Sequence, residues 1–203
     1  MTVNRREFNK QETVRHIRSV FMSMYAKGGI NGITINSLCK ECGIAKSTFY
    51  LYYEDKYQVL ESIENEHLDA LRNICREMNF PDMSDVREGK PSEWAVAVVN
   101  YLKDHADDFR ALLGKNGDPR FTYKWEKNIV GNFMFCFHAE KGDSRNATIA
   151  CNIFSSSLIR LYKHLLFEMP DISARDFSVI IGSVLKFTLF DFQAFADGTD
   201  TRY

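Results

Sequence analysis

The sequence lacks the features that mark several large classes of protein. Its 203 residues include only four Pro and five Cys. No apolar run reaches the length of about 18 residues that a membrane-spanning helix needs, so we expect no contact with a membrane interior. The stretch 1–10 is polar throughout, so we expect no signal peptide. The sequence shows neither the alternating pattern of strands nor an internal repeat.

Motifs of common enzymes are also missing. The sequence contains no G-x-S-x-G, no Walker A and no G-x-G-x-x-G motif. None of the five His residues is paired at the spacing of metal ligands, so we expect no metal site, no cofactor and no catalytic residue. The odd number of scattered Cys residues favours reduced thiols in the cytoplasm. We therefore expect that the protein is not an enzyme.

The charge is balanced in total but unevenly distributed. The 26 Lys and Arg and 27 Asp and Glu residues give a net charge of −1. Residues 1–60 hold nine basic and five acidic residues, a net charge of +4, and residues 61–203 carry −5. A basic end on an acidic body suits a protein that directs one end to phosphates. The imbalance is small, so it only supports the motif described next.

The stretch 34–60 predicts two short helices and the start of a third. Thr34 can cap the first helix, and apolar residues follow it at helical spacing. Gly43 can take the left-handed conformation that ends a helix and turns the chain. A second helix is predicted over Ala45–Tyr52, with Phe49 buried. Two short helices joined by a tight turn form a helix-turn-helix, whose second helix enters the DNA major groove.

This stretch resembles the DNA-binding domain of the TetR family of bacterial transcriptional regulators. The matching residues are Thr34, Ile35, Leu38, Cys42, Gly43, Ile44, Thr48, Phe49, Tyr50, Tyr52, Tyr53, Lys56 and Leu60. Ala45 departs from the pattern, because the family often has a capping Ser there, and the loss of that cap costs roughly 1 kcal/mol. The resemblance implies a homodimer that binds a palindromic, double-stranded DNA operator, responds to a small-molecule effector and represses transcription.

The resemblance and the helical periodicity together predict an all-α protein. We expect an N-terminal three-helix helix-turn-helix domain over residues 1–55. A C-terminal helical ligand-binding and dimerisation domain is expected over residues 56–203. Besides the two short helices, predicted helices cover Lys10–Lys27, Asp55–Met78, a segment capped by Ser92, Asp107–Leu113, Pro119–Phe137, Ser144–Phe167 and a last segment capped by Ser173.

The resemblance assigns DNA contacts to the recognition helix and its neighbours. The predicted DNA-binding residues are Thr34, Lys46, Ser47, Thr48, Tyr50, Tyr52 and Lys56. Lys46 is long enough to reach guanine O6 and N7. The phenols of Tyr50 and Tyr52 suit phosphate oxygens, although either ring could instead be a partly buried packing residue. Lys56 and the backbone N–H of Thr34 lie at helix starts, where a phosphate can bind.

Two interpretations of the first domain stay open beside this one. The helix-turn-helix could bind another protein, or it could bind DNA with no small-molecule effector involved. A less favoured alternative is a dithiol redox enzyme that uses Cys39 and Cys42. Because both Cys residues fall on the apolar stripe of their predicted helix, we expect them to be structural.

The second half should hold the effector pocket that the resemblance implies. The candidate lining residues are Trp94, Phe109, Phe121, Trp125, Phe133, Tyr162 and Phe187. Aromatic residues at helical spacing also fill ordinary cores, so each of these residues has that alternative. We expect a largely apolar pocket and effector, and the sequence does not identify the effector.

The last two predicted helices are apolar on more than one face. Each therefore has more surface to bury than its own domain covers. We expect a dimer interface of four helices, two from each subunit. The candidate interface residues are Phe154, Leu158, Leu161, Ile181, Leu185 and Leu189.

Overall fold

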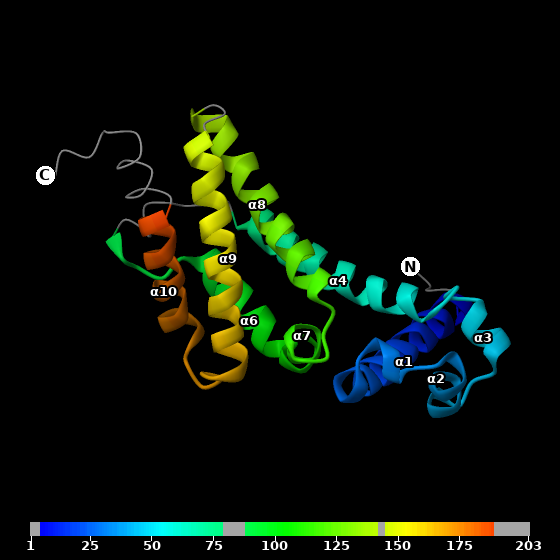
Figure 1. Ribbon diagram of the computed structural model, residues 1–203. Helices are drawn as coiled ribbons and strands as arrows, with labels where there is room; N and C mark the ends of the chain where they lie inside the picture. Colours follow the sequence, from blue (N-terminus) through cyan, green and yellow to red (C-terminus); the bar gives the residue numbers. More distant parts are fainter. Residues whose placement is uncertain (1–4, 79–87, 142–144, 189–203) are drawn as a thin grey trace, which may run out of the picture. The chain divides into compact units, whose positions relative to one another are not determined.

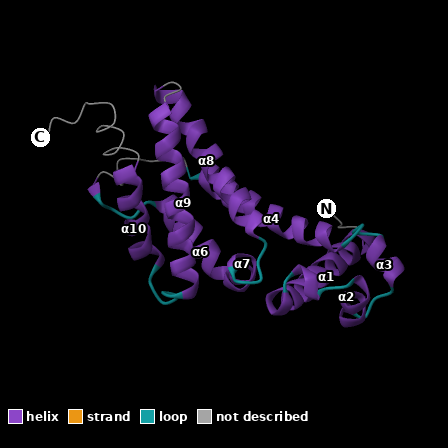
Figure 2. Ribbon diagram, in the orientation of Figure 1, coloured by secondary structure: helices purple, strands orange, loops and turns teal. Residues whose placement is uncertain are grey.

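The computed structural model describes residues 5–78, 88–141 and 145–188, and their side chains within 9–78, 88–132 and 148–188. These ranges contain helices and loops and no strand (Figure 2), which confirms the predicted all-α fold class. The elements are α1 (Arg5–Gly28), the 3-10 turn η1 (Ile30–Gly32), α2 (Ile35–Cys42), α3 (Lys46–Tyr50), α4 (Lys56–Glu77), α6 (Glu93–Asp104), α7 (Ala106–Leu113), α8 (Pro119–Lys141), α9 (Arg145–Phe167) and α10 (Ala174–Lys186) (Figure 1).

The chain forms two compact units, and each is discontinuous in sequence. The first consists of Met1–His67 and Asp107–Phe121, and the second of Leu68–Ala106 and Thr122–Tyr203. The two domains predicted over residues 1–55 and 56–203 are functional domains, one for DNA binding and one for ligand binding and dimerisation. This division remains a prediction.

The first unit is built on α1, which packs against η1 and α2, while α2 packs against α3. Ile17, Phe21 and Tyr25 follow one another at intervals of four residues and are fully buried, because residues at this spacing share one face of a helix. The rings of Phe21 and Tyr25 stack with centroids 5.9 Å apart. The Tyr25 hydroxyl accepts a hydrogen bond from the backbone N–H of Asp118 (2.9 Å). Residues 107–121 thus complete the core of this unit.

Polar contacts join α4 to the other helices of the first unit. Arg18 on α1 pairs with the Glu66 carboxylate and donates to the Ser62 carbonyl (3.4 Å). The buried His67 ring lies with Nε2 3.3 Å from Asp108 Oδ2 on α7. The N-terminal half of α4 is therefore held on two sides.

The second unit contains α6, most of α8, α9, α10 and the end of α4. In it, α10 packs against α6 and α9. The stacked rings of Trp125 and Tyr162, with centroids 5.3 Å apart, join α8 to α9. Lys103 Nζ donates to the Ile172 carbonyl (2.6 Å) and so ties α6 to the loop before α10. Apolar packing and polar contacts together hold this unit.

The two Ser caps predicted for the second unit have different outcomes. Ser173 Oγ accepts a hydrogen bond from the Asp176 N–H (3.1 Å), which confirms the cap of α10. Ser92 does precede α6, but its hydroxyl is buried and makes no hydrogen bond to any residue that the structure describes. The prediction of a side-chain cap at Ser92 was therefore wrong.

Candidate functional site

The helix-turn-helix begins with a reciprocal cap at Thr34. Its hydroxyl accepts a hydrogen bond from the Ser37 N–H (3.0 Å), and the Ser37 hydroxyl accepts one from the Thr34 N–H (3.0 Å). The predicted cap of α2 is confirmed. The Thr34 N–H donates to Ser37 within the protein, and its predicted contact with a phosphate remains a prediction.

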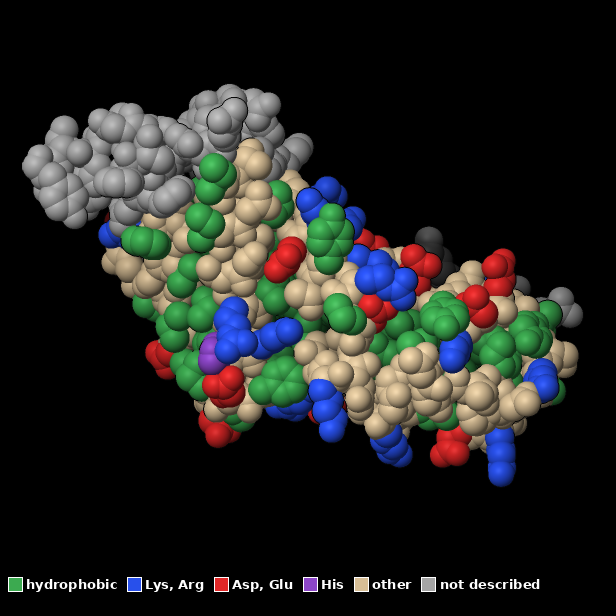
Figure 3. All heavy atoms as spheres, in the orientation of Figure 1, with side chains coloured by type: hydrophobic (Ala, Val, Ile, Leu, Met, Phe, Trp, Pro, Cys, Tyr) green, Lys and Arg blue, Asp and Glu red, His purple; other side chains and the backbone are tan. Residues whose placement is uncertain are grey.

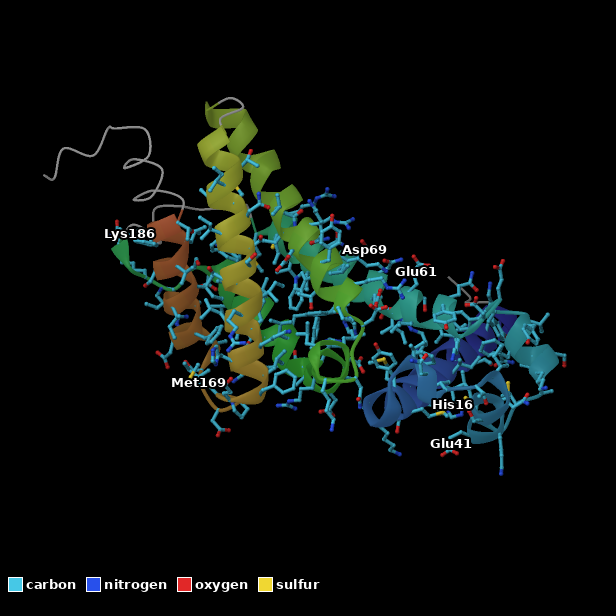
Figure 4. All side chains as sticks on the ribbon, in the orientation of Figure 1. His16, Glu41, Glu61, Asp69, Met169 and Lys186 are labelled. Carbon is cyan, nitrogen blue, oxygen red and sulfur yellow. The ribbon has the colours of Figure 1, made fainter. Side chains whose placement is uncertain are left out.

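The turn between α2 and α3 is set by Gly43. Its backbone has φ 66° and ψ 29°, the left-handed conformation predicted for it. The Ile44 N–H then donates to the Cys39 carbonyl (3.0 Å). His16 on α1 places Nε2 3.2 Å from the Cys42 carbonyl (Figure 4), so the end of α2 also has a side-chain partner. These contacts fix the direction in which α3 leaves the turn.

Helix α3 is shorter than predicted. It covers Lys46–Tyr50 rather than 45–52. The chain then continues as a turn, in which the N–H groups of Tyr52 and Tyr53 donate to the Phe49 carbonyl. Ala45 precedes the helix without any side-chain cap, as predicted. The rings of Phe49 and Tyr53 are buried, and their centroids lie 5.9 Å apart. These rings anchor one side of α3, so its other side faces outward.

The outward side of α3 carries most of the predicted DNA-binding residues. Lys46 and Ser47 are exposed, Tyr50 is 55% exposed, and Thr48 and Tyr52 are half-buried. Figure 3 shows basic and hydrophobic side chains together over this helix. An ammonium, a hydroxyl and a phenol on one short surface can donate hydrogen bonds to phosphates and to base edges.

Leu51 is an exposed residue of this surface that the sequence analysis did not select. Its side chain is 78% exposed, the largest value among the exposed large apolar residues described. An apolar side chain in a major groove can contact the methyl group of thymine. The sequence signal for this exposure was its position directly after Tyr50, at the end of the helix that Phe49 anchors.

Lys56 has a structural role that the sequence did not reveal. Its ammonium donates to the carbonyls of Ile30 and Ile33, both at 2.8 Å, and so ties the start of α4 to η1. Two of its three N–H groups are therefore engaged within the protein, and its predicted contact with a phosphate remains a prediction. The predicted cap beside it is confirmed, because Asp55 Oδ1 accepts from the Gln58 N–H (2.8 Å).

The Cys39 and Cys42 thiols are buried in α2. Burial raises the pKa of both thiols, for Cys42 to about 11. A thiol with such a pKa stays protonated at neutral pH and is a poor nucleophile. Among the residues with described side chains, no group of three or more His, Cys, Asp and Glu could hold a metal ion. The geometry thus gives no support to the dithiol alternative.

The aromatic residues predicted to line a pocket lie in several places. Trp94, Trp125 and Tyr162 line one cavity in the second unit, Phe109 and Phe121 are buried in the first unit, Phe187 is 64% exposed, and the side chain of Phe133 lies outside the described residues. Periodicity shows that an aromatic residue is buried but not which core receives it. Cys75, Asn128 and Asn132 also line the cavity, and we missed them because polar residues in a helix usually face solvent.

The residues predicted for the dimer interface lie mostly inside their own unit. Phe154, Leu158, Ile181 and Leu185 are buried, Leu161 is half-buried, and Leu189 lies outside the described residues. Other apolar residues of α9 and α10 are exposed instead, namely Ile149, Ile153 and Ile180, as is Phe187 directly after α10. Hydrophobic side chains are visible along these helices in Figure 3. Because four of the predicted residues already fill the core, these exposed residues are the better candidates for an interface.

Comparison with known proteins agrees with this geometry. Residues 19–63 match the family model described as bacterial regulatory proteins, tetR family. The uncharacterized HTH-type transcriptional regulator YuxN of Bacillus subtilis (strain 168) is 24% identical over 117 residues, which are 58% of this chain and 39% of YuxN. The chain therefore spans less than half of that relative's length.

Two solved structures share the fold over nearly their whole length. A TetR transcriptional regulator from Streptococcus agalactiae 2603V has a TM-score of 0.63 and 18% identity, covering 89% of this chain and 97% of its own. The dihydroxyacetone kinase operon activator DhaS has a TM-score of 0.57 and 15% identity, covering 87% and 96%. Among the described residues, no helix is both long enough and apolar enough to cross a membrane. Residues 19–63 thus match the helix-turn-helix of the TetR family of bacterial regulatory proteins, and the chain shares the fold of a solved TetR regulator.

Proposed function

We propose that the protein is a cytoplasmic transcriptional regulator that binds a palindromic DNA operator as a homodimer and responds to a small-molecule effector. The observation that carries this proposal is the outward side of α3. There Lys46, Ser47 and Tyr50 are presented by a helix that Phe49 anchors and Gly43 directs. Two such helices, one from each subunit, would enter successive major grooves about 34–36 Å apart.

The test of DNA binding is selection from random duplex DNA at about 150 mM salt, where non-specific binding is weak. We expect a palindrome to be enriched, and its half-site spacing gives the distance between the two recognition helices. Failure to enrich any sequence with the folded protein would contradict the proposal.

Variants of α3 test which surface binds the selected DNA. Lys46→Ala and Tyr50→Phe should each weaken binding, by roughly 1–3 kcal/mol where a base contact is lost. Lys127→Ala is the matched control, because Lys127 is an exposed Lys on α8 in the second unit. Full affinity in both α3 variants would remove α3 from the interface.

The proposed dimer uses the exposed apolar residues of α9 and α10. Ile149, Ile153 and Ile180 lie on these two helices and Phe187 directly follows α10, and exposed apolar surface of this kind marks association sites. A twofold dimer pairs the same surface of both subunits, which suits a palindromic operator. Sedimentation of Ile153→Asp, described in the Discussion, tests this part.

The proposed direction of regulation is repression, which follows from the resemblance to the family. One structural neighbour is named an operon activator, so the direction needs its own measurement. A reporter promoter that contains the selected operator should lose transcription when the protein is present. A gain of transcription would show activation and leave the DNA-binding proposal intact.

A further inference from the structure

The second unit contains a small cavity that is partly open to solvent. Residues of α4, α6, α8 and α9 line it, and none of its ten lining residues carries a formal charge. We propose that this cavity binds an uncharged, planar or compact apolar molecule through one amide, carbonyl or hydroxyl group, and that it rejects carboxylates and phosphates. The inference rests on the proposed effector response and adds the chemical class of the effector.

The absence of charge from the described lining decides against an ionised ligand. An anion that leaves water needs a cationic partner or several hydrogen-bond donors, because the free energy lost on desolvation otherwise exceeds the free energy gained from contacts in the site. The lining offers no Lys, Arg or His for that purpose. A neutral ligand avoids this cost, and the aliphatic and aromatic walls favour its apolar part.

The polar part of the cavity is a pair of carboxamides on one face of α8. Asn132 Nδ2 donates to Asn128 Oδ1 (3.3 Å), and Asn128 Nδ2 donates to the Leu68 carbonyl (3.5 Å). Each of these bonds uses one of two amide hydrogens, so each side chain has a second N–H that neither of these two bonds uses. The Asn132 side chain is half-buried and also has a carbonyl oxygen. A carboxamide that both donates and accepts matches neutral amide, carbonyl and hydroxyl groups.

The aromatic wall of the cavity is flat and rigid. Trp125 and Tyr162 stack at an interplanar angle of 10°, and Trp94 completes the aromatic lining. All three rings are buried, so their positions are fixed by packing. Burial raises the pKa of Tyr162 well above its ordinary value, which keeps this phenol uncharged. The parts of these rings that line the cavity offer an apolar surface to a ligand.

The tryptophans make the cavity directly observable. The sequence has only two Trp residues, and both line the cavity, so intrinsic fluorescence reports its occupancy. The probes are two matched pairs that differ in charge, benzamide with benzoate and hexanamide with hexanoate. We expect at least one amide to change the fluorescence at millimolar concentration, with affinity at least tenfold above that of its carboxylate. A carboxylate that binds as tightly as its amide, or no response to either amide, would overturn the inference.

Variants of Asn132 test the polar contact. Asn132→Leu keeps a similar size and should weaken amide binding at least tenfold. Asn132→Asp should reverse the preference, so that the cation benzamidinium binds more tightly than benzamide. Asn100→Leu, at an exposed position on α6, is the matched control and should leave both affinities unchanged. Circular dichroism of each variant shows whether it is folded. Folded Asn132 variants with wild-type affinities would contradict the assigned contact.

Failure of this inference differs from failure of the proposed function. If the protein prefers the amides to the carboxylates but selects no DNA sequence, the inferred ligand class is supported and the proposed role as a regulator is contradicted. If the protein selects an operator but prefers the carboxylates, the proposed role is supported and the inferred ligand class is contradicted. Release of the operator by the bound amide is the further result that joins the two.

Discussion

Both units combine buried aromatic rings with polar contacts at helix ends, but different features stand out in each. In the first unit, polar side chains bond to backbone groups at helix ends, as Thr34 does at α2 and Lys56 does at η1. In the second unit, the stacked rings of Trp125 and Tyr162 stand in an apolar core that leaves a cavity. A surface that reads DNA needs its backbone held in one geometry, whereas a ligand site needs space and a few polar groups. Substitutions in one unit should therefore have different effects from the same kinds of substitution in the other.

The largest expected effect separates core from interface in the second unit. Leu185 is fully buried, so Leu185→Asp should destabilise the protein by about 4 kcal/mol or more, because it buries an unpaired carboxylate. Ile153 is 41% exposed, so Ile153→Asp should keep the free energy of unfolding within about 1 kcal/mol of wild type while weakening the dimer. Urea unfolding and sedimentation measure the two effects. A dimer that survives Ile153→Asp would place the interface elsewhere.

A smaller loss of stability is expected when the Lys56 ammonium is removed from the first unit. Lys56→Met removes the hydrogen bonds to the carbonyls of Ile30 and Ile33 and should cost about 1–3 kcal/mol. The exposed Lys40→Met is the control and should change stability little. Urea unfolding without DNA measures both variants. Equal stability of the two would show that the contacts of Lys56 with these carbonyls contribute nothing.

The salt dependence of DNA binding then tests the remaining role of Lys56. If its third N–H contacts a phosphate, as the family resemblance predicts, Lys56→Met should lower the slope of log affinity against log salt by about one. An unchanged slope, together with reduced stability, would assign Lys56 to the fold alone.

Two glycines sharpen the comparison further. Gly43 has φ 66° and no heavy atom within 4 Å of an added Cβ, so Gly43→Ala should cost roughly 1–2 kcal/mol from backbone strain alone. Gly131 in α8 also has space for a Cβ, but its φ is not positive, so Gly131→Ala should stabilise by about 0.5–1 kcal/mol. Thermal unfolding measures both. We expect the two substitutions to change the stability in opposite directions. A change in the same direction would contradict the assigned backbone conformations.

The last expected effect is confined to alkaline pH, where the protein should lose stability. Burial raises the pKa of Cys42 from 9.0 to about 11, so the folded first unit holds this proton more tightly than the unfolded chain does. The stabilisation is complete below about pH 9 and is lost as the pH rises toward about 11. Cys151 in the second unit has a pKa raised to about 11 for the same reason. Cys42→Ala and Cys151→Ala should each flatten the alkaline decline seen by urea unfolding.

Local features of the helix-turn-helix could be predicted from sequence because neighbouring residues determine them. Thr34 caps a helix through Ser37, three residues away, and Gly43 turns the chain through its own backbone. Phe49 is buried where its helical spacing predicts. The contacts of Lys56 join residues 23 and 26 positions apart, and no local pattern encodes them.

The second unit was harder to predict because its residues have the same periodicity in a core, at a cavity or at an interface. Leu185 and Ile153 both looked like apolar helix positions, yet one is buried and the other is exposed. Phe109 and Phe121 belong to the first unit although they lie far along the chain. Asn128 and Asn132 line a cavity that only the packing of several helices creates.

The discontinuity of the first unit has a consequence for the order of events on the ribosome. Its segments Met1–His67 and Asp107–Phe121 are separated by residues that belong to the second unit. The hydroxyl of Tyr25 therefore waits for Asp118, which is translated roughly 5–20 s later at the usual rate of about 5–20 residues per second. During that interval the nascent helix-turn-helix lacks part of its core. The DNA-reading end is thus made first but completed only after more than half of the chain has been synthesised.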